Sequence, residues 1–434
     1  MHPWRRTPIR VGALTALALA LPFSTVSASG AAASATIGRV GTGSYTFNFP
    51  WSALRDGKTM YVSDRSHARV VRFTLNDAGT AATAEPEVVA GTGGECVAED
   101  QPACGDGGVA TSARLVPATM ALTTNGLLIL DAGTNRLRRV YTKGPKAGTI
   151  EAFAGNGTAG YAGDGGNAKD AQIGTVVGGI AVGPDKNVYF ADTLNNRIRC
   201  VGCAGRNKIS TVVGTGKAAG HGQGEVTTGS PDGTPALQAN LLGPWGVAFD
   251  AQGRLLFTTG CDVAAVLVPM QSGHPEQAAD YCDPTVRRRN NNANQTITRI
   301  AGIPGQLGVV TSTGPARQRR LNNPLGLGVR GDRIYVSTLG SSFLTWMTIF
   351  TNPDFTLADL VAMSPGILCI GCAGNGKISR VAGERPANGA IGNGGPAADA
   401  ATFTYSLQPQ FTGDLYYADP IPSANQVRRI RIRN

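Results

Sequence analysis

The chain has 434 residues, a formal net charge of +10 and only 16% charged residues, against about 25% in an average soluble protein. Glycine, with 59 residues, is about twice as frequent as average but shows no every-third repeat, which excludes collagen. The hydrophobic fraction of 42% is too high for a disordered chain. Together with 25 prolines, this composition indicates an all-β protein rather than a long coiled coil.

The first 35 residues have the layout of a secretory signal peptide. Three arginines within the first ten residues precede an apolar run over 11–23, which is too short to span a bilayer comfortably. Small residues then lead to two candidate cleavage points, near Ala28 and near Ala35. We therefore expect residues 1–35 to be a signal peptide and small-residue linker. We also expect a secreted or periplasmic protein whose mature chain has no transmembrane segment.

Eight cysteines fall into four pairs that are close in sequence: Cys96 and Cys104, Cys200 and Cys203, Cys261 and Cys282, Cys369 and Cys372. An even number of cysteines behind an export signal indicates disulfides, and we expect these local pairings, although spacing alone does not prove them. The two Cys-x-x-Cys pairs leave two alternatives open. A four-thiolate zinc site would need both pairs to meet in space, and a redox motif would need a βαβ context that the sequence does not show.

The rest of the chain repeats. Four segments combine a β-rich run, an Asp-containing turn and a run that alternates basic and apolar residues: 60–72, 128–138, 188–199 and 415–430. A further β-rich run follows in several units, and Gly-rich loops separate the units. Alternation with period two is typical of strands, and counting the units gives six with four strands each. The sequence therefore predicts an all-β, six-bladed β-propeller of four-stranded antiparallel blades, a single domain over residues 36–434.

The two ends of this region complete one blade. Residues 426–433 have the pattern of a third strand with nothing after it, and residues 35–43 have the pattern of the missing fourth strand. Their pairing would close the ring and remove exposed sheet edges. We define the top face as the end that carries the turns between second and third strands, and the bottom face as the opposite end. Two segments near 262–295 and 351–374 interrupt the pattern, and we expect both to be insertions on the bottom face.

Residues 191–199 (Ala-Asp-Thr-Leu-Asn-Asn-Arg-Ile-Arg) and 211–216 (Thr-Val-Val-Gly-Thr-Gly) resemble NHL repeats, and the Gly-Asp-Gly-Gly loops resemble the secreted bacterial branch of that family. The resemblance implies a six-bladed propeller. It also points to the NHL-like amidating lyases, which hold zinc with three histidines that follow the inner-strand proline. The matching positions here hold no histidine: Trp51, Ala118, Gly178, Trp245, Leu325 and Ser406. We therefore expect neither that zinc site nor that activity.

Residues that the repeat does not require are the better candidates for binding. Trp51 and Trp245 occupy equivalent inner-strand positions in the first and fourth units, on opposite sides of the ring. They could flank the channel mouth and stack on a sugar or an aromatic group, with packing between blades as the alternative. Arg317, Arg319 and Arg320 in a top loop could attract an acidic ligand, with solvated loop charges as the alternative.

An aspartate recurs after the second strand of four units: Asp64, Asp131, Asp192 and Asp419. An aspartate at the start of a turn can cap the following backbone amides, and its recurrence favours this structural role. The alternative is a top-face calcium site built from several of these carboxylates. We expect no cofactor other than, at most, calcium.

The sequence shows no convergent nucleophile and base and no metal cluster, which favours binding over catalysis. We expect a secreted, monomeric propeller that binds a peptide, a protein or an envelope glycan through its top face. The alternative is a hydrolase or lyase with a site at the channel mouth, with or without calcium. The positive charge would permit nucleic-acid binding, but the export signal argues against it.

Overall fold

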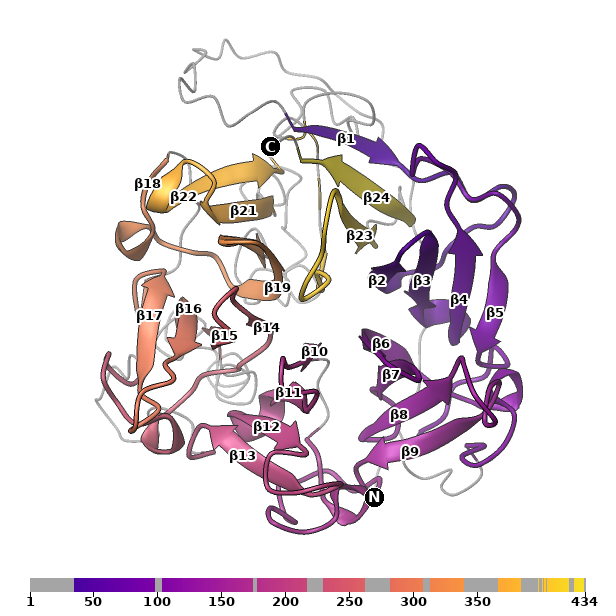
Figure 1. Ribbon diagram of the computed structural model, residues 1–434, viewed down its shortest axis with the longest axis horizontal. Helices are drawn as coiled ribbons and strands as arrows, with labels where there is room; N and C mark the ends of the chain where they lie inside the picture. The colour runs from indigo at the N-terminus through magenta and orange to yellow at the C-terminus, as the bar shows by residue number, and fades with distance from the viewer. Residues whose placement is uncertain are drawn as a thin grey trace, which may run out of the picture. The chain divides into compact units, whose positions relative to one another are not determined.

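The structure is a computed structural model that describes residues 35–97, 104–174, 178–216, 229–261, 282–306, 313–338, 366–383, 397, 400, 402, 404–420 and 425–432. These residues form six antiparallel sheets, which follow one another around a central axis in sequence order (Figure 1). In blades one to five the first strand lies nearest the axis and the later strands lie farther out. The predicted six-bladed β-propeller is confirmed.

Most blades have the four expected strands. Blade one contains β2 (Pro50–Asp56), β3 (Thr59–Asp64), β4 (Arg69–Thr74) and β5 (Glu87–Ala90). Blade two contains β6 (Pro117–Thr123), β7 (Gly126–Asp131), β8 (Arg136–Tyr141) and β9 (Ile150–Ala154). Blade three contains β10 (Ile180–Val182), β11 (Val188–Asp192), β12 (Arg197–Val201) and β13 (Ile209–Val213). Blade four contains β14 (Val247–Phe249), β15 (Leu255–Cys261), β16 (Cys282–Arg289) and β17 (Ile297–Ala301). Blade five contains β19 (Pro324–Arg330), β20 (Arg333–Thr338), β21 (Gly366–Gly371) and β22 (Gly374–Ala382), and the short β18 (Gly314–Pro315) adds a fifth strand beside β22.

Short 3-10 helices occupy connections between strands: η1 (Arg65–His67), η3 (Ala110–Ser112), η4 (Ala168–Asp170), η5 (Thr193–Asn195), η6 (Ala236–Gln238) and η8 (Ala316–Gln318). Within the described part of the chain, no helix has the length and apolar character needed to cross a membrane. Residues 1–34 lie outside the described part, so the signal peptide stays a prediction.

The two ends of the chain meet in blade six, as the sequence predicts. Strand β1 (Thr36–Arg39) pairs antiparallel with β24 (Gln426–Arg431), with Thr36 opposite Arg431, and β24 pairs with β23 (Leu415–Asp419). The N-terminal strand therefore closes the ring and covers the edge that β24 would otherwise expose.

Blade six departs from the expected four strands, because its sheet contains three strands among the described residues. The segment 405–411, where Ser406 marks the expected inner strand, does not pair with β23. It instead runs beside β19 of blade five, where the Val329 N–H donates to Pro409 O and the Phe411 N–H donates to Val329 O, both at 3.1 Å. Residues 405–409 are surrounded by inner-strand residues of blades two to five, so this segment lies in the channel.

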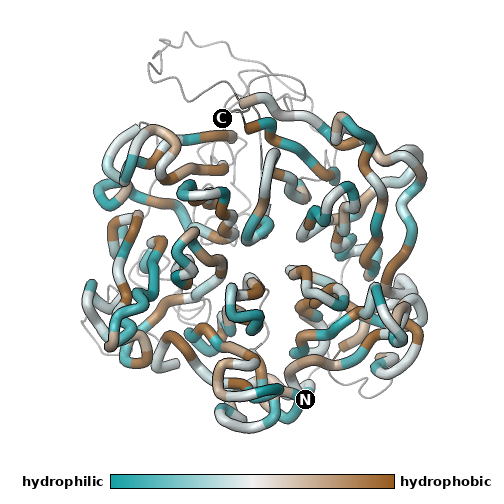
Figure 2. The backbone as a smooth tube through the Cα atoms, viewed as in Figure 1, coloured by the Kyte–Doolittle hydropathy of each residue, from teal (hydrophilic) through white to brown (hydrophobic). Residues whose placement is uncertain are grey.

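The core lies between neighbouring blades and around the axis. Buried apolar side chains from adjacent blades form continuous clusters, and Figure 2 shows hydrophobic stretches that recur along the strands. The inner strands approach one another so closely that a side chain has no room at two positions. A Cβ on Gly246 would lie 2.2 Å from Leu325 O, and one on Gly326 would lie 2.6 Å from Leu407 N. Glycine at these positions permits the tight packing of the inner ring.

The prediction that the insertions near 262–295 and 351–374 lie on the bottom face is wrong. Residues 262–281 and 339–365 lie outside the described residues, but each follows the second strand of its blade and precedes the third. The chain therefore leaves and re-enters both blades at the top face. Residues 282–289 form β16 rather than a loop. The three consecutive arginines at its end look like a polar loop in the sequence, but Arg287 is only 2% exposed because Asp283 neutralises it.

Cysteine pairs close short loops, one between blades one and two and two within blades three and five. The structure bonds Cys96 to Cys104, Cys200 to Cys203 and Cys369 to Cys372, with Cα–Cα distances of 5.7–5.8 Å. The backbone register places Cys261 opposite Cys282 at the end of the β15–β16 hairpin, so this pairing stays a prediction with compatible strand geometry. Neither Cys-x-x-Cys pair is left reduced for a thiolate zinc site.

Candidate functional site

The two candidate tryptophans meet at the channel through a residue that the sequence analysis did not single out. The Trp51 ring stacks on Tyr405 with a centroid distance of 3.8 Å and an interplanar angle of 2°, and Trp245 Nε1 donates a hydrogen bond to Tyr405 O at 3.2 Å. The Arg65 guanidinium lies 4.8 Å from the centroid of the Trp51 ring, and Trp51 is only 6% exposed. The protein's own tyrosine therefore occupies the stacking surface that Trp51 would offer to a ligand.

Tyr405 is a packing residue rather than a base. Burial raises its pKa to about 12, which exceeds the ordinary value near 10, so the hydroxyl stays protonated at neutral pH. Burial also lowers the pKa of Arg65, although an arginine remains charged at neutral pH. At its top end the channel is thus filled by a stacked aromatic pair beside a cation.

The recurrent aspartates are fully buried, and three of them contact an arginine of the third strand of their own blade. The shortest ion-pair distances are 3.2 Å for Asp131–Arg138, 3.4 Å for Asp192–Arg199 and 3.0 Å for Asp419–Arg428. Asp64 instead lies 2.8 Å from His67 Nδ1 and 2.7 Å from the Tyr45 hydroxyl. The structure does not gather these carboxylates, and among the described residues no group of three or more potential metal ligands is found.

Sequence reasoning missed the buried arginines that these aspartates contact. Arg138 and Arg199 have side chains 1% and 0% exposed, and each also binds an aspartate of a Gly-Asp-Gly-Gly loop, Asp106 or Asp164, at 2.8 Å. The signal was present as the second arginine of each Arg-x-Arg alternation. Burial raises the pKa of Asp192 to about 6, despite the opposing effect of Asn195 and Arg199.

The candidate arginines lie apart from the tryptophans. Arg317 is the middle residue of η8, which packs against β17 and β22 on the outer part of blades four and five, and it forms an ion pair with Asp232. Arg319 donates to Thr313 O at 3.1 Å, and Arg320 donates to Gln306 Oε1 at 3.0 Å. The structure therefore does not bring the candidate arginines together with the candidate tryptophans.

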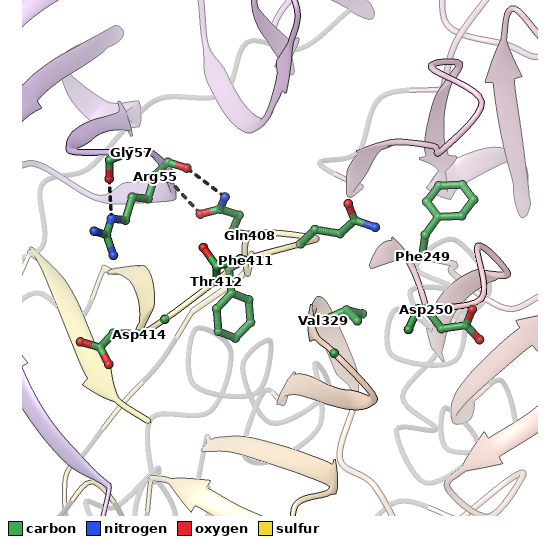
Figure 3. A pocket seen from close by; sticks show the side chains of 13 residues that line it. Arg55, Gly57, Phe249, Asp250, Val329, Gln408, Phe411, Thr412 and Asp414 are labelled. Atoms are coloured by element: carbon green, nitrogen blue, oxygen red, sulfur yellow. Dashed lines mark hydrogen bonds between the residues drawn. The ribbon is translucent and has the colours of Figure 1, made fainter. Parts of the chain in front are cut away.

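A pocket of about 540 Å³ opens at the other end of the channel. Turns between first and second strands of blades one, four and five line it, together with residues 408–414, so it lies at the bottom face. Figure 3 shows Arg55 and Asp414 on one side and Phe249 and Asp250 on the other. The size falls within the range of about 300–1,000 Å³ that is typical of small-molecule sites.

Both carboxylates at this pocket are neutralised. Asp250 Oδ2 accepts from Arg254 Nε at 2.7 Å, and Asp414 Oδ2 accepts from Arg429 Nε at 2.5 Å. The Asp414 carboxylate also accepts from the Ile432 N–H at 3.2 Å. Each carboxylate of the pocket is thus paired with an arginine of its own blade.

The segment that lies in the channel, residues 405–411, is held to blade one by the Gln408 side chain, which bonds the backbone of β2 as a neighbouring strand would. Gln408 Oε1 accepts from the Arg55 N–H at 2.9 Å, and Gln408 Nε2 donates to Arg55 O at 3.0 Å. No inner strand of blade six is found among the described residues, and this amide supplies hydrogen bonds that hold residues 408–414 at the pocket wall.

Replacing Gln408 by leucine is expected to lower the free energy of unfolding by about 1–3 kcal/mol, since two hydrogen bonds to a partly buried backbone are lost. Chemical denaturation measures the change. Gln410→Leu is the matched control, because Gln410 is exposed and its side chain forms no hydrogen bond to the described residues. Equal stabilities of the two variants would show that the Gln408 amide does not stabilise the channel segment.

Comparison with known proteins agrees with this architecture. The family model for the teneurin NHL domain matches residues 51–156. Teneurin-3 of Mus musculus is 41% identical over 86 residues, which cover 20% of this chain and 3% of that protein. Teneurin-3 of Danio rerio is 28% identical over 301 residues, covering 65% of this chain and 10% of that protein. The chain thus spans a tenth or less of the length of these curated relatives.

Among solved structures, an auxiliary nutrient binding protein from Bacteroides thetaiotaomicron superposes with a TM-score of 0.52 at 10% identity, covering 91% of this chain and 76% of that one. At this identity the likeness concerns the fold alone. The chain is therefore a six-bladed β-propeller, and part of its sequence is similar to the teneurin NHL domain.

Proposed function

We propose that this chain is an exported binding propeller that takes up part of a peptide, a protein or an envelope glycan in the pocket at its bottom face. The observation that carries the proposal is the pocket itself, a cavity of about 540 Å³ whose lining includes the apolar Phe249, Val329 and Phe411. Each of its two carboxylates is paired with an arginine. This site replaces the expected top-face site, because Tyr405 covers Trp51.

Binding without catalysis fits these contacts better than hydrolysis or lysis. A general base must be able to contact the proton that it removes, whereas Asp250 and Asp414 are each paired with an arginine of the protein itself. The arginine pairing of Asp131, Asp192 and Asp419 likewise supports a structural role for these residues, so the proposal includes no calcium. Export is supported by the signal-like first 35 residues and by three disulfide bonds, which persist in oxidising compartments.

Filling the pocket with a large side chain tests the proposal. Thr412 is exposed and lines the pocket, so Thr412→Trp should leave the fold intact and obstruct the cavity. We expect the purified protein to bind a ligand class on glycan and peptide arrays, and Thr412→Trp to weaken that binding at least about tenfold, since a blocked pocket loses most of its contacts. Thr111→Trp, at an exposed position of η3 outside the pocket, is the matched control and should bind normally.

Three results would count against the proposal. Equal binding by both tryptophan variants would move the site elsewhere. Conversion of the bound ligand to a product, detected by mass spectrometry after prolonged incubation, would establish the hydrolase or lyase alternative. No binding to any glycan or peptide would contradict a binding function of either kind.

A further inference from the structure

We infer that the ligand of this pocket is an acidic sugar, a glycan unit whose carboxylate binds Arg55 and whose hydroxyls bind Gln410 and Thr412. The inference rests on the proposed function, since it assumes that the pocket is a binding site, and it names the chemical class of the ligand.

Arg55 supplies the one charge of the pocket that the described residues leave uncompensated. Its Nε donates to Gly57 O at 2.7 Å, and its guanidinium carbon lies 5.1 Å from the centroid of the Tyr416 ring. No carboxylate of the described residues lies within 4.0 Å of its nitrogens. The hydrogen bond to Gly57 and the Tyr416 ring thus hold the guanidinium in place. Its terminal nitrogens can donate to an anion, and arginine is suited to a two-point contact with a carboxylate.

The remaining lining favours a hydroxyl-bearing ring over a simple anion. The Gln410 amide and the Thr412 hydroxyl are exposed and form no hydrogen bonds to the described residues. Both groups donate and accept, as sugar hydroxyls do. Phe249, Val329 and Phe411 add apolar side chains to the lining, which can contact the C–H face of a sugar ring, and Figure 3 shows Phe249 across the view from Phe411.

An acidic peptide side chain is the competing ligand, because it would also pair with Arg55. Such a side chain carries no hydroxyls, so it would leave Gln410 and Thr412 without partners. The cavity of about 540 Å³ is far smaller than a folded partner and matches one end of a glycan chain. The polar groups and the volume together favour the sugar.

Calorimetric titration of the full chain tests the inference with four probes at equal concentration: trigalacturonate, triglucuronate, neutral maltotriose and triglutamate. We expect the acidic trisaccharides to bind about 10- to 100-fold more tightly than maltotriose, the range that corresponds to a hydrogen bond to a charged group. Added salt should weaken the acidic sugars and leave maltotriose unchanged. Arg55→Gln should reduce the acidic sugars to the affinity of maltotriose.

Matched variants show whether a loss of sugar binding comes from the removed contact or from a general change in charge or stability. Arg39→Gln makes the same charge change at an exposed position of β1, outside the pocket, and should bind like the wild type. Gln410→Leu should weaken both acidic and neutral sugars and leave triglutamate unaffected. Because Gln408 binds the backbone of Arg55 and not its side chain, Arg55→Gln keeps that contact, and an unchanged melting temperature verifies it.

The outcomes decide between the inference and the proposed function. Equal affinity of acidic and neutral sugars, or no effect of Arg55→Gln, would overturn the role of Arg55. Triglutamate binding as tightly as the trisaccharides would overturn the sugar class. In each of these cases, loss of binding in Thr412→Trp would still uphold the pocket as a binding site. Binding that survives Thr412→Trp would overturn both.

Discussion

Replacing Trp51 by alanine is expected to lower the free energy of unfolding by about 3–5 kcal/mol, the usual range for the removal of a buried aromatic side chain from a core. Trp51 is only 6% exposed, stacks face to face on Tyr405 and lies beside the Arg65 guanidinium. Its removal leaves a cavity at the point where the channel segment meets blade one. Chemical denaturation of the two proteins measures the difference.

The matched control is Tyr161→Ala, because Tyr161 is an aromatic residue that is 60% exposed and whose ring centroid lies 4.6 Å from the Arg197 guanidinium carbon. Tyr161→Ala is expected to lower the free energy of unfolding by about 1 kcal/mol or less. If Trp51→Ala were as stable as the wild type and lost ligand binding, Trp51 would be an open stacking surface and the covered arrangement would be wrong.

Replacing Arg199 by methionine is expected to destabilise the protein by about 3–5 kcal/mol at pH 8, because the buried Asp192 carboxylate then loses its cation. The Arg199 and Asp192 side chains are both 0% exposed, and Arg199 also binds Asp164 and the Gln172 carbonyl oxygen. Thermal or chemical unfolding measures the change. Lys58→Met is the control, since the Lys58–Asp77 pair is at the surface and its loss should produce no measurable change.

The effect of Arg199→Met should depend on pH. Burial raises the pKa of Asp192 to about 6, above the value near 3.9 of an exposed aspartate. A carboxyl whose pKa is raised on folding stabilises the fold fully below its unfolded pKa, and this contribution is lost as the pH rises through its folded pKa. Without Arg199 the pKa rises further, so the variant should be closer to the wild type at pH 5 than at pH 8. A pH-independent loss would show that Asp192 does not titrate in this range.

The parts of the fold that could be predicted from the sequence are those that local pattern specifies. Period-two alternation recurs along the chain and the Asp-containing turn recurs in four of the six units, so the number of blades and the closure by residues 36–39 follow from counting. The inner strand of blade six could not be predicted in this way. Pro409 and Phe411 pair through their backbone with Val329 of another blade, and a contact between segments so far apart in the sequence leaves no local pattern.

The candidate site was harder to predict, for a similar reason. The position of Trp51 at the channel follows from its place on the inner strand, but the covering ring belongs to Tyr405, which is 354 residues away in a segment without a repeat pattern. Arg287 looks like a loop charge in sequence because its partner, Asp283, compensates it only within the folded strand. The pocket combines four blades, and no single segment carries its pattern.

Hydrogen exchange of the full chain with and without trigalacturonate tests most directly the claim that a ligand binds at the bottom face. The account predicts slower exchange confined to four segments: 55–58, 249–255, 329–333 and 408–414. It predicts no change around the top-face residues Arg65 and Trp245. Protection at the top face, or the absence of protection anywhere at a saturating concentration, would contradict the account.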